Sequence, residues 1–282
     1  MKNILLPTDY STYANNAFLY ALNLANKLRS KLYVMSSYVA PVISAVHAGQ
    51  PEMVHSVYQE IENSRREYAS VNNKNLIKLA QENNLPTDNV EFVFKHGAVL
   101  SSVHQTLSEH EISLIVMGVY GESGFKGEFL GSNTTAVIRN VKLPVLAIPL
   151  DASYSPIQNI AFTTLFKEKD FSALQQIIEI SELVNAKVYC IHVGSDQSNT
   201  TDVLLQSENW IKTFKEKDIE FVFLEKENTL EETINRFIID KNIDVIAIVR
   251  RNRNLFDRLI RSSLSTKLTF HTEIPIFVFH QS

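Results

Sequence analysis

Five of the eight glycines in this 282-residue chain fall in the single stretch from Gly118 to Gly131, directly after the apolar run ISLIVM. Glycines between a strand and a helix let backbone N–H groups approach an anion closely. The residues from Ser132 to Val141 are predicted to form that helix, and the free N–H groups of its first turn would attract phosphate. The hydroxyl of Thr134 adds a donor. The stretch therefore predicts a phosphate site, against the alternative of a flexible connector without a ligand.

The glycine spacing does not match the common phosphate motifs. The chain contains no G-x-x-x-x-G-K-[ST], and GVYGES is not G-x-G-x-x-G. The early turn LPTDYS lacks the Gly-Gly turn and paired serine of an ATP pyrophosphatase. Gly118, Gly121, Gly131 and Ser132 instead form G-x2-G-x9-G-[ST]. This glycine pattern is a weak signal alone, and it gains specificity because Asp9 follows the first apolar strand. Without the glycines, Asp9 would be interpreted as a helix-capping turn residue.

Short apolar runs alternate with longer amphipathic stretches and form the elements that must position these residues. The runs lack polar alternation, which is typical of strands buried on both faces of a parallel sheet. Apolar residues from Ala14 to Leu28 follow helical spacing, with Ser11 as the N-cap. The pattern predicts an α/β fold of doubly wound domains with parallel five-stranded sheets. The expected strands of the first sheet are Asn3–Leu6, Lys31–Ser37, Val90–Phe94, Ser113–Met117 and Val145–Ile148.

The second half of the chain repeats the first. NILLPTDYS, which begins at Asn3, aligns with NIAFTTLFK at Asn159, and ISLIVMG at Ile112 aligns with IDVIAIV at Ile243. The matches keep their order and fall on apolar runs, so we expect two tandem domains, residues 1–150 and 151–282. We also expect the last strands of the two copies to meet across an approximate two-fold axis, because each would otherwise leave an unpaired edge.

The glycine pattern after an apolar strand, the opening ILLPTDYS and the tandem halves together resemble the universal stress protein family over essentially the whole chain. The resemblance implies Rossmann-like domains of the adenine-nucleotide alpha-hydrolase type. It also implies ATP as the ligand, with or without Mg²⁺, because family members that carry the pattern bind ATP. Tyr120 and Asn133 depart from the residues usual in the family, which leaves the nucleotide preference open.

Carried over onto this sequence, the resemblance implies that Asp9 holds the adenosine end and that the backbone of Ser37 faces the adenine. Met117 and Gly118 would border the ribose and phosphates. A β-carbon at Gly131 would intrude on the phosphates, and glycine there would also permit a positive φ. The implied nucleotide-binding residues are Pro7, Thr8, Asp9, Ser37, Met117, Gly118, Gly121, Gly131, Ser132, Asn133 and Thr134.

The second copy lacks these features. Val249, Asn252 and Ser262 stand where the first copy has its glycines, and Leu165 replaces the aspartate. Side chains there would occupy the space that phosphate needs. We therefore expect ATP binding in the first domain only, and a structural second domain.

The sequence gives little support for metal binding or catalysis. The histidines show no metal-ligand spacing. His192 lies on a predicted buried strand beside Cys190, where a hydrogen-bonded core histidine is expected, and Trp210 is expected to pack in a helix. Phosphoryl transfer needs a positioned base and metal, and neither Glu122 nor Glu128 has an assigned place. We expect no catalytic residue and no metal site; slow hydrolysis of bound ATP stays open.

Composition restricts the class of protein. A formal net charge of −4 argues against a nucleic-acid partner, and no apolar run is long enough to span a membrane. The start MKNILLPTDYS does not have the pattern of a secretory signal, and a single cysteine cannot form an internal disulfide. These features predict a soluble cytoplasmic protein.

Two functions of different classes remain. One is a nucleotide-dependent regulatory protein of the stress response, and the other is a ligand-free scaffold for dimerisation and interaction. The first copy also has an extra segment, with a long helix expected between Pro51 and Asn84 and no counterpart expected in the second copy. We expect this arm to mediate a homodimer of tandem chains; packing on its own domain is the alternative.

Overall fold

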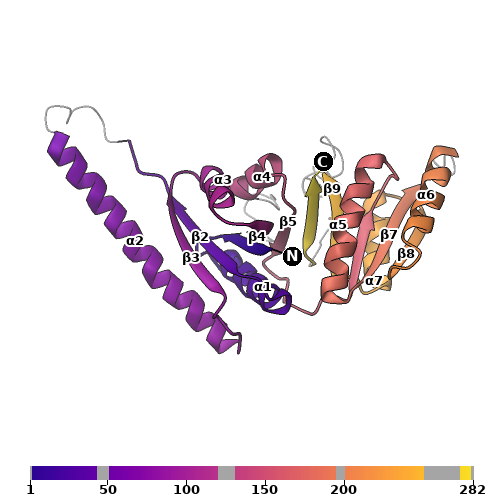
Figure 1. Cartoon of the computed structure of the whole chain (residues 1–282), viewed down its shortest axis with the longest axis horizontal. Coiled ribbons are helices and arrows are strands. Elements are labelled where there is room, and N and C mark those ends of the chain that lie inside the picture. Colours follow the sequence, from indigo (N-terminus) through magenta and orange to yellow (C-terminus); the bar gives the residue numbers. More distant parts are fainter. Residues whose placement is uncertain (1, 43–50, 120–130, 195–200, 251–273, 281–282) are drawn as a thin grey trace.

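The protein forms one continuous ten-stranded sheet (Figure 1). A computed structural model describes residues 2–42, 51–119, 131–194, 201–250 and 274–280. The strand order is β3-β2-β1-β4-β5-β10-β9-β6-β7-β8. Strands pair in parallel throughout each half, and helices connect them on both faces. The predicted α/β class with doubly wound parallel sheets is confirmed.

The described residues of the first half form five strands and four helices in alternation. Each predicted strand is present, with ends that differ from the expected ones by a few residues at most. The elements are β1 Asn3–Pro7, α1 Thr12–Leu28, β2 Leu32–Tyr38, α2 Pro51–Glu82, β3 Val90–His96, α3 Val99–Glu109, β4 Ile112–Val119, α4 Ser132–Asn140 and β5 Val145–Pro149.

Elements of the second half follow the same order. α5 begins and ends 156 positions after α1, at the offset that the aligned asparagines Asn3 and Asn159 define. The elements are β6 Asn159–Thr163, α5 Glu168–Val184, β7 Lys187–Gly194, α6 Thr201–Thr213, β8 Ile219–Glu225, α7 Leu230–Asp240, β9 Val245–Arg250 and β10 Ile276–His280.

The two halves join where their last strands pair. β5 and β10 run antiparallel, with Ile276 opposite Ala147 and Val278 opposite Val145. All four of these residues are buried. The expected meeting of the final strands is therefore confirmed, and the pairing removes two sheet edges that would otherwise be exposed.

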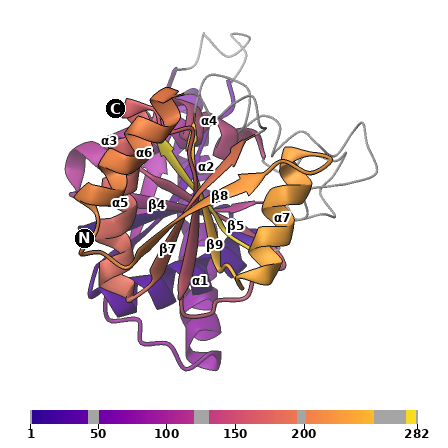
Figure 2. The same cartoon turned by 90° about the vertical axis from the view of Figure 1, so that its right-hand side faces the viewer.

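Two apolar layers cover the sheet (Figures 1 and 2). On one face α1, α2, α5 and α6 pack in a single cluster, to which they contribute Phe18, Leu76, Leu174 and Trp210 respectively. On the other face α3, α4 and α7 cover the strands. The first cluster crosses from one half to the other, so the halves share a core as well as a sheet.

Two observations bear on what the sequence led us to expect of the long helix α2. A shorter helix, α6, occupies the same place in the second half, between the second and third strands, so the expectation of no counterpart was wrong. The later part of α2 packs on its own half, where Ala69, Leu76 and Ala80 are buried. Towards its N-terminus the helix runs beyond the sheet (Figure 1).

Candidate functional site

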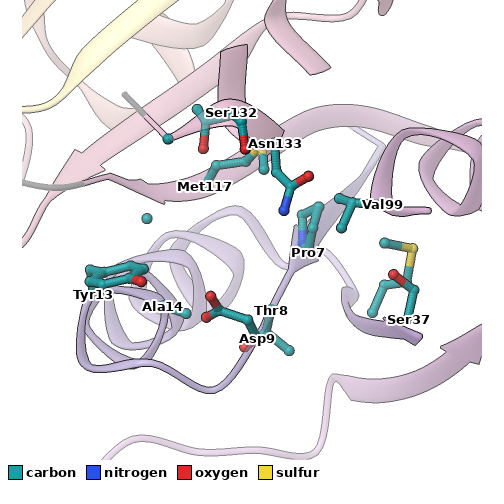
Figure 3. Close-up of a pocket in the computed structure, with 14 residues that line it drawn as sticks. Pro7, Thr8, Asp9, Tyr13, Ala14, Ser37, Val99, Met117, Ser132 and Asn133 are labelled. Atoms are coloured by element: carbon teal, nitrogen blue, oxygen red, sulfur yellow. The ribbon is translucent and has the colours of Figure 1, made fainter. Parts of the chain in front are cut away.

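A cavity of about 330 Å³ lies at the carboxyl ends of β1, β2 and β4, beside the start of α4 (Figure 3). In a doubly wound sheet this is the usual position of a ligand. The residues predicted from the sequence gather here, except Gly121, which lies outside the described residues. The predicted residues on its walls are Pro7, Thr8, Asp9, Ser37, Met117, Gly118, Gly131, Ser132, Asn133 and Thr134.

The turn after β1 presents Asp9 to the cavity. Asp9 Oδ1 accepts hydrogen bonds from the backbone N–H of Ser11 at 3.0 Å and from its hydroxyl at 2.5 Å. Ser11 is the N-cap of α1, and its Oγ accepts from Ala14 N, as the sequence predicted. Within the described residues Asp9 Oδ2 has no hydrogen-bond partner. One oxygen of Asp9 thus shapes the turn, which confirms the turn role considered for it, and the residue also lines the cavity.

The start of α4 closes the opposite side of the cavity. Its N-cap, Gly131, provides no side-chain acceptor, and the first turn contains no acidic residue. The first backbone hydrogen bond of the helix runs from Thr135 N to Gly131 O at 3.0 Å, so the N–H groups of Ser132, Asn133 and Thr134 precede the helical ladder. Such an end attracts an anion. Gly131 has φ −63°, so the positive φ considered for it is not used.

Gly118 has a packing role that the sequence did not reveal. A β-carbon on this residue would lie 2.4 Å from the carbonyl oxygen of Tyr13 and 3.0 Å from Ala14 N. The first turn of α1 can therefore lie against the end of β4 only if residue 118 is glycine. In the second half Val249 stands at the matching position and is buried, and α5 approaches β9 less closely than α1 approaches β4.

Four further residues line the cavity that sequence reasoning missed. Met35 and Val99 give it an apolar side together with Met117, while Tyr13 and Ala14 belong to the first turn of α1. Figure 3 shows Val99 beside Ser37, on the side away from Tyr13. Val99 begins α3, directly after the end of β3, and that position at the sheet's carboxyl edge was the available signal. An apolar side next to an anion-binding helix end suits a ligand with a flat ring and a charged tail.

The corresponding turn of the second half is closed by its own side chains. Asp170 is fully buried, and its Oδ2 accepts hydrogen bonds from Thr164 Oγ1 and Leu165 N, both at 3.0 Å. Asp170 stands where the first half has Ala14, the small residue on the cavity wall. A carboxylate thus occupies the position at which the first half leaves space.

The core residues of the second half match most expectations. His192 is buried, and its Nδ1 lies 3.0 Å from the carbonyl oxygen of Thr164, whereas its Nε2 has no partner among the described residues. His192 is therefore a buried core histidine, as expected, but only one of its two ring nitrogens has a hydrogen-bond partner among the described residues. Burial raises the pKa of the Cys190 thiol. Trp210 is buried in α6, and its packing role is confirmed.

No cluster of three or more histidine, cysteine or acidic side chains in the part of the chain that the structure describes could hold a metal ion. None of the described helices is both long and apolar enough to cross a membrane.

Comparisons with known proteins agree with the fold. A universal stress protein from Archaeoglobus fulgidus DSM 4304 has a similar structure, with a TM-score of 0.68 at 20% identity over 99% of this chain and 98% of that one. Universal stress protein Slr1230 from Synechocystis sp. is 24% identical over 99% of this chain and its own full length. Universal stress protein MJ0531 from Methanocaldococcus jannaschii is 25% identical over 52% of this chain and 81% of its own.

The description "Universal stress protein family" belongs to the family model that matches residues 1–149, which is more than half of the chain. The opening strand, the Asp9 turn and the glycines around α4 all lie within this range. The resemblance stated from the sequence is therefore confirmed. The chain belongs to the universal stress protein family.

Proposed function

We propose that the cavity of the first half binds ATP and that the chain acts as a nucleotide-dependent regulatory protein in the stress response. The observation that carries this proposal is the cavity itself. Its walls bring together the start of α4, which has no side-chain cap, an apolar side and a free carboxylate oxygen of Asp9. Family membership supports a nucleotide as the ligand.

The chemistry of the walls suggests how ATP lies in the site. Phosphates would meet the N–H groups of Ser132, Asn133 and Thr134, with Gly121 and Gly131 contributing backbone. The adenosine would lie towards Asp9, Thr8, Pro7 and Ser37, against Met117. Mg²⁺, where it enters with ATP, would be held mainly by phosphate oxygens and water, as this ion prefers. We propose binding without a catalytic residue, since Asp9, the carboxylate on the described part of the cavity wall, is assigned to the adenosine end and not to the phosphates.

The proposal includes an asymmetry between two domains, residues 1–150 and 151–282, with one ATP site per chain. The second domain has Val249 and Leu165 at the matching positions, and Asp170 closes its turn. Its role would be structural: it supplies β10 to the shared sheet.

The test is direct. Protein purified without added nucleotide is heated, and the released small molecules are identified by chromatography and mass spectrometry; calorimetric titration with ATP then gives the number of sites. We expect an adenine nucleotide and one site per chain. Gly131→Val should abolish binding, while Ser262→Val, at the matching position of the second half, should bind like the parent. No released nucleotide and no heat of ATP binding would favour the ligand-free scaffold; two equivalent sites would remove the asymmetry.

We also propose a homodimer of tandem chains through the N-terminal part of α2. The helix runs beyond the sheet there, and Val57 on this part is 40% exposed (Figure 1). Val57→Glu should reduce the mass measured by light scattering to that of one chain. Val42→Glu is the control, because Val42 is also an exposed apolar residue but lies outside α2. An unchanged mass in Val57→Glu would mean that α2 packs only on its own domain and takes no part in a dimer interface.

A further inference from the structure

Tyr10, the residue after Asp9, has an unusual backbone conformation, and its side chain contacts α2. Its φ is 63°, in the left-handed region that bulky residues seldom adopt. The backbone N–H of Tyr10 donates to Thr8 Oγ1 at 3.0 Å, which closes the turn on which Thr8 and Asp9 face the cavity. A conformation of this kind persists where the surroundings hold it.

The side chain of Tyr10 joins this turn to α2. Its hydroxyl lies 2.9 Å from Asn73 Oδ1, and its ring meets the ring of Tyr68 edge-on at 5.9 Å between centroids. The phenol donates a hydrogen bond to the amide oxygen of Asn73, and burial raises the pKa of Tyr10 above its ordinary value.

α2 also reaches a second residue next to the cavity. Tyr38 directly follows Ser37, and its ring stacks on Phe94 at 5.4 Å. The guanidinium of Arg66, on α2, lies 4.7 Å from the centre of the same Phe94 ring. Tyr10 thus contacts α2 directly, and Tyr38 is linked to the same helix through the ring of Phe94.

The second half provides an internal comparison. Phe166 stands where the first half has Tyr10, with φ 53° and a backbone N–H that donates to Thr164 Oγ1 at 2.8 Å. Its ring packs on Trp210 of α6, the counterpart of α2, at 5.1 Å. In each half, the aromatic residue of the turn after the first strand therefore packs on the helix between the second and third strands. Only the first half, which has the cavity residues, adds a hydroxyl to this contact.

We propose that Tyr10 is a positioning residue: through its hydrogen bond to Asn73, α2 holds the Thr8–Asp9 turn in the geometry that receives the nucleotide. This inference rests on the proposed ATP site. Binding and helix order are linked in both directions, because a helix that favours the bound turn must itself be favoured when the nucleotide binds. ATP should therefore reduce local opening of α2 around Asn73.

The experiment measures ATP affinity by calorimetry in the full-length parent, Tyr10→Phe, Asn73→Ala and the double variant. Tyr10→Phe keeps the ring on Tyr68 and removes only the hydroxyl. Each single change should weaken ATP about three- to tenfold, the usual effect of one hydrogen bond. The double variant should be no weaker than the singles, because both remove the same bond. Asn83→Ala is the control: Asn83 directly follows α2, bonds only to that helix through Leu79 O, and should bind like the parent.

Hydrogen exchange provides a readout that a purely structural role would not change. In the parent and in Asn83→Ala, ATP should slow exchange of the α2 amides around Asn73; in Tyr10→Phe and Asn73→Ala this protection should be lost. If the parent itself binds no ATP, the proposed function fails and this inference fails with it. If the parent binds and either single variant keeps full affinity and protection, the inference alone is wrong. Asn73→Ala decides the matter if Tyr10→Phe folds poorly.

Discussion

Arg250, the last residue of β9, donates a hydrogen bond from Nη1 to the carbonyl oxygen of Arg139 at 2.8 Å. The same nitrogen lies 3.3 Å from the carbonyl oxygen of Ile138. Both acceptors are in the last turn of α4, so a cation from the second half satisfies the C-terminal end of a helix in the first. The other end of that helix faces the cavity. The second half therefore supports the proposed site, although none of its described residues lies on the walls.

Arg250→Gln should test this support. Loss of the charged donor should lower the free energy of unfolding by about 1–2 kcal/mol and weaken ATP by a few-fold, because the carbonyls of α4 lose their partner. Urea unfolding and ATP titration measure the two effects. Arg236→Gln is the control, since Arg236 makes an exposed ion pair with Glu227, a kind of pair that contributes little. Equal behaviour of the two variants would show that α4 does not depend on Arg250.

Gly118→Ala should disturb both the fold and the site. The added β-carbon would lie 2.4 Å from the carbonyl oxygen of Tyr13, so the first turn of α1 must move. We expect a loss of about 1–3 kcal/mol in the free energy of unfolding, as overpacking usually causes, and a clear drop in ATP affinity. Urea unfolding with and without ATP measures both. A variant with the stability and affinity of the parent would contradict the close contact between β4 and α1.

Cleavage of the chain near Ser153 should leave the halves together. The paired strands β5 and β10 are buried, and the apolar cluster beneath α1 and α5 includes residues of both halves. A protease site inserted after Ser153, followed by cutting and size-exclusion chromatography, should give one species that contains both fragments and has the mass of the uncut protein. Separate, folded, monomeric fragments would contradict a shared core.

His280 should make stability depend on pH. Burial and the neighbouring charge of Arg250 lower the pKa of His280 from its ordinary value of 6.5. The unfolded chain therefore takes up a proton at a higher pH than the folded chain, and stability falls as the pH decreases from about 6.5 towards the folded pKa. Urea midpoints at pH 7.5 and 5.5 should differ more for the parent than for His280→Gln. The same difference in both proteins would mean that His280 stays accessible to protons in the folded state.

The sequence predicted the fold well because the repeat and the buried strands leave local signals. The apolar run at Ile112 and its partner at Ile243 lie on β4 and β9, and the final strands meet as a need to cover edges suggests. Glycine spacing likewise indicated the position of the cavity, since Gly118 and Gly131 can be read directly from the sequence and both line it.

Contacts between distant side chains were beyond sequence reasoning. The bond between Tyr10 and Asn73 joins residues 63 positions apart, and neither residue type indicates the other. The requirement for glycine at 118 comes from the carbonyl of Tyr13, which only the packed structure brings near. The role of Asp170 was missed for a similar reason: a carboxylate early in a helix usually lies in solvent, and here the preceding turn encloses it.

The antiparallel join between β5 and β10 has a consequence for how the two halves can diverge. Identical subunits in a symmetric dimer must carry identical sites, so a substitution that closes one site closes both. Here the peptide link holds the second half beside the first, whatever residues it has at its own turn. Asp170 and Val249 can therefore be buried, and leucine can replace the aspartate at residue 165, without loss of the first cavity. One half is thereby free to evolve as a permanent partner while the other keeps the site.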